Sequence, residues 1–253
     1  MSIKNKDKLN QLLQDIPKGT VVLSSWLVSK GYSHSLQHRY LNSNWLEPIS
    51  RGAFKRKNDD VSIFGALYAL QYQNGKNIYL GGISALRLLG FAHYIEMSGT
   101  SFSLFAQTGF KLPNWFKENM EWKNHQLFCS GFLPPHIGTM DYDLGNFKIK
   151  ISTPVRALME CLEIAPKNFD LVEAYLIMEG LKSLKPTEVQ KLLEACTSIK
   201  VKRLFLYFSE VSNHAWFKYL DVDKINLGSG KRSIVKDGMY NEKYRITVPQ
   251  KIN

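Results

Sequence analysis

Apolar spacing near the start of the chain predicts three short helices in quick succession, and this feature constrains the fold most. In residues 4–16, leucine and isoleucine recur at helical spacing. A second helix can be capped by Ser24 or Ser25 and ends at Gly31. Ser33 can cap a third helix, which runs to about residue 43. Helices this close together are typical of a small helical domain.

The sequence WLEPISRGAFKR follows and predicts two short strands joined at Arg51-Gly52. Pro48 has no backbone N–H to donate, so we expect it on an edge strand. Three helices followed by a small hairpin is the element order of a winged helix-turn-helix. We place this domain at residues 1–58, because the Asn58-Asp59-Asp60 cluster and a change in charge follow it.

The rest of the chain, residues 59–253, predicts a larger mixed α/β domain, which makes the fold class α+β. Residues 101–151 are rich in β-formers and aromatics and predict several strands. Thr153 and Pro154 together predict the start of a helix. Further helices are predicted at about 169–181, 186–197 and 200–212. The tail alternates apolar and polar residues around Gly238, which indicates a closing hairpin.

Positive charge gathers at the two ends of the sequence. Residues 1–58 hold 10 basic and 3 acidic residues, a net charge of +7, and residues 200–253 hold 11 and 5, a net charge of +6. The middle carries −2 of the total of +11. This distribution favours two surfaces that face a polyanion, with nucleic acid as the first choice. The alternative is that basic ends serve solubility alone.

The third predicted helix has two contrasting faces. An arc of Leu36, Tyr40 and Leu41 is expected to face the other helices. The opposite arc carries hydrogen-bonding and phosphate-contacting side chains, namely Ser35, His38, Arg39 and Asn42. Such side chains suit a recognition helix, because short donors and acceptors reach base edges in the major groove. The alternative is an ordinary solvated helix face.

The hairpin after this helix adds four basic side chains that suit backbone phosphates or a minor groove. They are Arg51, Lys55, Arg56 and Lys57. Each phosphate that a protein neutralises releases counterions, so this binding is expected to weaken steeply with salt. Double-stranded DNA is therefore the predicted partner.

Few residue patterns in the sequence indicate a catalytic site or a metal site. His34 and His38 have i,i+4 spacing, but no acidic residue nearby completes a metal site. Asp141 and Asp143, with acids on a later helix, leave a metal-dependent nuclease as a minor alternative. A second alternative is a transcriptional repressor with a sensing second domain. We predict that the protein is not an enzyme and holds no metal or cofactor.

The segment LGSGKRS at 227–233 resembles a phosphate-binding loop but lacks its first glycine, since position 225 is Ile. We therefore reject nucleotide hydrolysis. Glycines in a turn still expose backbone N–H groups, and Lys231 with Arg232 adds charge, so an anion site is one interpretation. A tight hairpin with solvated basic residues is the other.

The cellular compartment is predicted from sequence features that the chain lacks. Three cysteines lie far apart without a C-x-x-C pair, which favours a reducing compartment. The start MSIKNKDKLN lacks a signal-peptide core, and no apolar run approaches the ~18 residues of a membrane span. We expect a cytoplasmic protein that has no contact with membranes.

Several stretches together resemble the AbiEi-type antitoxins of type IV abortive-infection toxin–antitoxin systems. They are LSSWLVSKGYSHSLQHRYLNSNWLEPISRGAFKR, IYLGGISALRLLGF, ISTPVRALMECLE, LLEACTSIKVKRLFLYFSE, HAWF and LGSGKRSIVKDGMYNEKYRITVP. The resemblance covers nearly the whole chain in unchanged order, and that order is more specific than any one stretch.

This resemblance implies a function in phage defence. It implies a winged helix that represses the antitoxin's own operon by binding inverted repeats, and an α/β domain that counters a nucleotidyltransferase toxin without a stable complex. The DNA-reading helix maps onto residues 33–43 and the wing onto 46–57. A basic C-terminal face, serving antitoxicity or nucleic-acid binding, maps onto Lys202, Arg203, Lys231 and Arg232.

Overall fold

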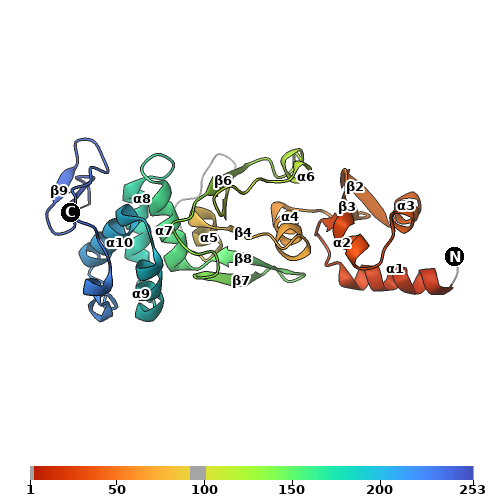
Figure 1. The fold of residues 1–253 in the computed structure, drawn as a ribbon, viewed down its shortest axis with the longest axis horizontal. Coiled ribbons are helices and arrows are strands. Elements are labelled where there is room, and N and C mark those ends of the chain that lie inside the picture. Colours follow the sequence, from red (N-terminus) through yellow and green to blue (C-terminus); the bar gives the residue numbers. More distant parts are fainter. Residues whose placement is uncertain (1–2, 92–100, 253) are drawn as a thin grey trace. The chain divides into compact units, whose positions relative to one another are not determined.

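The computed structural model describes residues 3–91 and 101–252 (Figure 1). The chain divides into two compact units: residues 1–79, 109–125 and 141–150 form the first, and the remaining residues form the second. The first unit begins with α1 (Ile3–Asp15), β1 (Val22–Leu23), α2 (Ser24–Ser29), α3 (His34–Asn42), β2 (Leu46–Ser50) and β3 (Ala53–Arg56). This order of elements is the predicted winged helix.

The three strands form an antiparallel sheet in the order β1-β3-β2. Pro48 lies on β2, an edge strand, as predicted. The helices bury an apolar core of their own against this sheet, and its members Leu12, Leu27 and Tyr40 are each 0% exposed. Every residue of that core lies between positions 9 and 54. Burial of these side chains supplies the main driving force for folding this segment.

The helix ends partly follow the predictions. Ser33 caps α3, since its hydroxyl accepts a hydrogen bond from the Leu36 N–H. Gly31 follows α2 with a φ of +84°, the left-handed conformation that glycine adopts without a steric penalty. The predicted cap of α2 is wrong: Leu23 is its N-cap residue, and the Ser24 hydroxyl donates to a side chain of α3.

A π-helical turn lies beside the winged helix in the same unit. α4 (Ile63–Tyr68) continues into η1 (Ala69–Gln73). The Gln73 amide accepts from the Leu23 N–H at 2.8 Å and donates to the Val21 carbonyl at 2.7 Å, so it bonds to β1 as a neighbouring strand would. Gly65 approaches the Gly19 carbonyl so closely that a Cβ atom would lie 1.9 Å from its oxygen. These contacts seat the winged helix on α4 and η1.

A five-stranded sheet follows in the order β6-β5-β4-β8-β7. Its strands are β4 (Ile78–Leu80), β5 (Phe102–Ala106), β6 (His125–Cys129), β7 (Thr139–Asp143) and β8 (Lys148–Ser152). β4 pairs with β8 in parallel. The short helices α5 (Gly82–Leu88) and α6 (Asn114–Lys117) lie between strands in the sequence. The prediction of several strands in residues 101–151 is confirmed.

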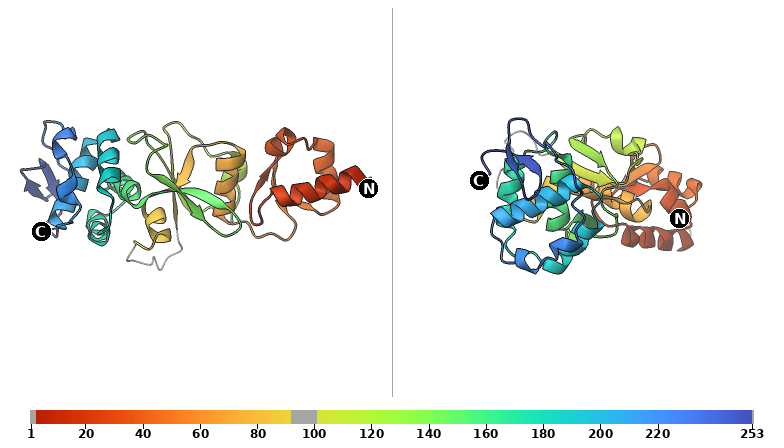
Figure 2. Two further views of the ribbon diagram at one scale, coloured as in Figure 1. Left: turned by 90° about the horizontal axis from the view of Figure 1, so that it is seen from below. Right: turned by 60° about the vertical axis from the view of Figure 1, so that its left-hand side comes forward.

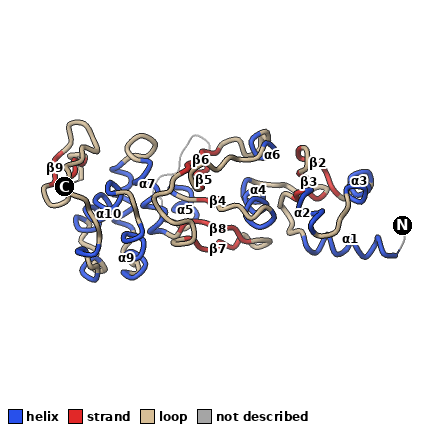
Figure 3. The backbone as a smooth tube through the Cα atoms, viewed as in Figure 1, coloured by secondary structure: helices blue, strands red, loops and turns tan. Residues whose placement is uncertain are grey.

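The second unit contains the helices α7 (Pro154–Ile164), α8 (Leu171–Gly180), α9 (Pro186–Ala195) and α10 (Ile199–Val211), with short 3-10 turns η2 (Phe217–Tyr219) and η3 (Val222–Lys224). α7 packs against the other three helices and against α5 (Figures 2 and 3). Pro154 occupies the first turn of α7, as predicted. Thr153 is its N-cap residue, but the hydroxyl makes no capping hydrogen bond.

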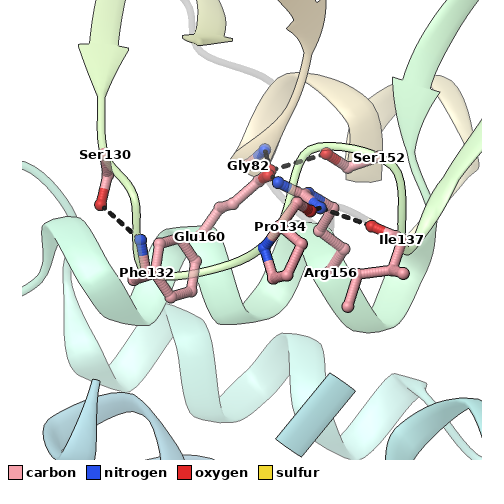
Figure 4. A network of polar contacts seen from close by, with 8 residues as sticks. All are labelled: Gly82, Ser130, Phe132, Pro134, Ile137, Ser152, Arg156 and Glu160. Atoms are coloured by element: carbon pink, nitrogen blue, oxygen red, sulfur yellow. Dashed lines mark hydrogen bonds and ion pairs between the residues drawn. The ribbon is translucent and has the colours of Figure 1, made fainter. Parts of the chain in front are cut away.

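A buried polar network fixes α7 to its surroundings (Figure 4). The Arg156 Nε donates to Glu160 Oε1 at 2.9 Å, and the two side chains are 2% and 0% exposed. The other carboxylate oxygen accepts from the Gly82 N–H at 2.9 Å and from the Ser152 hydroxyl at 2.7 Å. The guanidinium also donates to the Pro134 carbonyl at 2.7 Å. One ion pair therefore joins α7 to α5, β8 and a loop.

The chain ends in a hairpin of β9 (Met239–Asn241) and β10 (Ile246–Val248), which pair antiparallel. The expected hairpin is present, but the expected turn at Gly238 is wrong. The chain reverses between Asn241 and Arg245, where Arg245 has a φ of +52°. The Asn241 carboxamide accepts from the Tyr244 N–H at 2.9 Å and holds this turn.

Candidate nucleic-acid interface

The polar arc of α3 is exposed. Ser35, His38, Arg39 and Asn42 all face solvent, while Leu36 and Tyr40 are buried and Leu41 is half-buried. The structure thus gives the predicted helix the two faces that its spacing indicated. Each exposed side chain is free of the packing that holds the inner arc, so it is available to an external partner.

One residue of α3 that the sequence did not single out fixes the position of the helix. Gln37 is only 3% exposed. Its Oε1 accepts from the Ser24 hydroxyl at 2.7 Å, and its Nε2 donates to the Tyr32 carbonyl at 2.8 Å. The Ser24 N–H in turn donates to the Gly52 carbonyl in the wing turn at 2.9 Å. A chain of hydrogen bonds therefore connects α3, α2 and the turn between β2 and β3.

The wing presents its basic residues unequally. Arg51 and Lys57 are exposed. Lys55 is half-buried, pairs with Glu47 at 3.7 Å and donates to the Asp59 carbonyl at 2.9 Å. An exposed aromatic, Trp45, lies between α3 and β2 with 43% of its surface accessible. Trp45 lies outside the predicted apolar arc, and a tryptophan at such a position is a sequence signal for an exposed contact residue.

Arg56 has a structural task. Its guanidinium donates to the carbonyls of Leu13 and Ile16, at and just beyond the C-terminal end of α1. The last carbonyls of a helix lack partners within the helix, and a cation is favourable at that end. Arg56 therefore joins β3 to α1, and its contact with DNA stays a prediction.

The prediction of a basic face in the C-terminal part of the chain is wrong for two of its four residues. Lys202 and Arg203 lie on α10 at 4% and 1% exposure, so neither contributes to an exposed face. In the sequence, Lys202 and Arg203 look like an exposed polar edge beside the apolar residues of α10, so their burial was not predicted. Lys231 and Arg232 are exposed, and their role in a basic face stays a prediction.

The carboxylates considered for catalysis pair with cations. Asp141 lies on β7, where it contacts Lys150 Nζ at 2.8 Å and accepts from the Tyr72 hydroxyl at 3.1 Å. The hydrogen bond from Lys150 holds the pKa of Asp141 below its ordinary value. Asp143 pairs with Lys148 at 3.5 Å. Over residues 3–91 and 101–252, no group of three or more His, Cys, Asp or Glu side chains is placed to hold a metal ion.

The element order, the three-stranded sheet and the exposed α3 face define a winged-helix protein with a larger second domain. A family model described as the N-terminal domain of the AbiEi antitoxin, a transcriptional regulator, matches residues 5–97. A second model, described as transcriptional regulator, AbiEi antitoxin, type IV TA system, matches residues 100–249. The chain belongs to this family of type IV toxin–antitoxin regulators.

Among solved structures, the crystal structure of the RV2827C protein from Mycobacterium tuberculosis is similar. It is 14% identical, with a TM-score of 0.57, and the match covers 94% of this chain and 88% of that chain. At this identity the likeness concerns the fold. No curated protein matches the chain. None of the helices in the described ranges is long and apolar enough to cross a membrane.

Proposed function

We propose that the protein binds double-stranded DNA through its winged helix and represses its own operon at inverted repeats. Ser35, His38, Arg39 and Asn42 read the major groove, and the basic wing residues contact phosphates. The observation that supports the proposal is the exposed polar face of α3. The buried Gln37, on the same helix, anchors α3 to α2. Membership of a family of transcriptional regulators also supports the proposal.

The proposal assigns residues 1–58 to DNA binding and residues 59–253 to antitoxin activity. The separate apolar core of the first segment supports this division, since that core includes no residue beyond position 54. The second part counters a nucleotidyltransferase toxin without forming a stable complex. The protein acts in the cytoplasm and is not an enzyme.

A salt titration of binding to the protein's own upstream DNA tests the DNA proposal. Arg51→Ala and Lys57→Ala are expected to weaken binding on all sequences and to reduce the salt slope by about one for each lost phosphate contact. His38→Ala is expected to reduce discrimination between operator and random DNA. Lys123→Ala, which removes an exposed charge on another part of the chain, is the control. Unchanged operator binding in all the winged-helix variants would rule out this interface.

A co-expression assay tests the antitoxin proposal separately. The gene next to the protein's own is expected to encode a nucleotidyltransferase that stops growth, and the full chain is expected to restore growth. If the adjacent gene does not encode such a toxin, a transcriptional repressor with a sensing second domain becomes the better interpretation.

A further inference from the structure

The loop Leu227–Arg232 wraps its carbonyl groups around buried and exposed arginines. Arg203, from α10, donates to the carbonyls of Leu227 at 2.7 Å, Gly228 at 3.0 Å and Gly230 at 2.6 Å. The carbonyl of Ser229 between them accepts from the Arg245 guanidinium at 2.5 Å. Four successive carbonyl groups are therefore directed at two guanidinium groups.

This arrangement fixes where the N–H groups point. In a trans peptide the carbonyl and the following N–H point in opposite directions, and none of these peptides is cis. The N–H groups of Ser229 and Lys231 therefore point away from Arg203. The N–H of Gly230 points away from Arg245.

The backbone N–H groups of Ser229, Gly230 and Lys231 are free to donate hydrogen bonds to a ligand. The neighbouring Gly228 N–H donates to the Asn226 carboxamide at 2.9 Å. By contrast, none of the N–H groups of Ser229, Gly230 and Lys231 has a hydrogen-bond acceptor among the residues that the structure describes. All three residues are exposed. A run of outward N–H groups in a glycine turn is an anion-binding arrangement.

Two basic side chains without acidic partners belong to the same stretch of chain. Lys231 and Arg232 are exposed, and neither forms an ion pair with any acid in the described ranges. Lys231 Nζ lies 5.1 Å from the ring centre of Tyr240. The Arg232 N–H donates to the Arg245 carbonyl at 2.9 Å, which attaches the loop to β10.

The cations of this region are close enough to affect one another. Burial, followed by the charges of Arg232 and Arg245, holds the pKa of Arg203 below its ordinary value. Clustered like charges destabilise the folded chain unless an anion compensates them. The free loop is thus positively charged and rich in donors.

We infer that the outer face of this loop binds a phosphate group. The N–H groups of Ser229, Gly230 and Lys231 contact its oxygens, and the side chains of Lys231 and Arg232 neutralise its charge. No helix follows the loop in the described residues up to 252, so the site differs from that of nucleotide hydrolases and serves binding alone. The inference deepens the C-terminal part of the proposed function and rests on it only for the biological use of the site.

Backbone amide shifts of the full chain, measured by NMR during titration with inorganic phosphate, test the site directly. The amides of Ser229, Gly230 and Lys231 are expected to move together with one saturating curve. The double variant Lys231→Ala, Arg232→Ala is expected to bind phosphate about tenfold more weakly, because two charge-assisted contacts are lost. Absent or unsaturable shifts at these amides would overturn the inference.

The double variant Lys236→Ala, Lys251→Ala is the matched control, since it removes two exposed charges from the same end of the chain. It is expected to retain phosphate binding. An equal loss in both double variants would mean that general charge attracts the ion, and the inference would fail. Thermal melting of each variant checks that the fold is intact.

Three further probes identify the source of the phosphate: an oligonucleotide with a 5′-phosphate, the same oligonucleotide without it, and a nucleoside triphosphate. Preference for the phosphorylated oligonucleotide or the triphosphate assigns a terminal phosphate. Equal binding of the two oligonucleotides, lost in Lys231→Ala, Arg232→Ala, assigns the nucleic-acid backbone. Binding that this variant leaves unchanged contradicts the site. Arg51→Ala, Lys57→Ala distinguishes the two proposals, because it should lose operator binding and keep the phosphate-induced shifts.

Discussion

The Ser24 hydroxyl donates a 2.7 Å hydrogen bond to Gln37, which links the first turn of α2 to the middle of α3. This hydrogen bond helps to fix how α3 lies against the helix before it. The direction of the exposed side chains of α3 depends on this link, although neither Ser24 nor Gln37 belongs to the exposed polar arc.

Gln37→Leu is expected to destabilise the protein by about 1–3 kcal/mol, because buried partners of the amide lose their hydrogen bonds. Operator binding should fall further than stability alone explains, with less discrimination between operator and random DNA. Denaturant unfolding and binding titrations measure the two effects. Gln14→Leu, at an exposed position of α1, should change neither.

Arg56→Ala and Arg51→Ala are expected to act in opposite ways. Loss of Arg56 leaves the carbonyls of Leu13 and Ile16 without their cation and should lower the melting temperature. Loss of the exposed Arg51 should leave melting unchanged and flatten the salt dependence of DNA binding. A stable Arg56→Ala protein with a reduced salt slope would contradict the structural task assigned to Arg56.

Arg156→Met is expected to cost about 3–5 kcal/mol of unfolding free energy, since the Glu160 carboxylate is then buried without its cation. Adding Glu160→Gln should recover part of that loss, because the double variant buries no unpaired charge. A double-mutant cycle by denaturant unfolding measures the coupling. Additive effects would show that the two side chains do not act as a pair.

Thiol labelling at pH 8 should distinguish the three cysteines. Cys129 is exposed, whereas Cys161 and Cys196 are buried. Burial raises the pKa of Cys196 to about 11, so only roughly one molecule in a thousand carries its thiolate at this pH. One thiol per chain is expected to react rapidly and the other two only in denaturant. Rapid reaction of two or more thiols would contradict the described core.

Helical periodicity predicted the winged helix well because its information is local. The spacing of Leu36 and Tyr40 places both on the buried arc, and Ser33 caps the helix from three residues away. The mixed second domain, the helix that begins at Pro154 and the edge position of Pro48 were predictable for the same reason.

Long-range partners account for what the sequence concealed. Gln37 is buried because its acceptor and donor come from the preceding helix and turn, and no local pattern indicates that pairing. Arg203 resembles a surface cation in sequence, yet its acceptors lie 24 to 42 residues further along the chain. The final turn formed after Asn241 instead of at Gly238, because the Asn241 carboxamide holds the chain reversal.

The Gln73 side chain has a consequence for self-association. It occupies the hydrogen-bonding groups of β1, one border of the three-stranded sheet, while Pro48 removes a donor from β2, the other border. Neither border is therefore a template to which a strand from a second copy can add. The winged helix is therefore protected from edge-to-edge aggregation through this sheet.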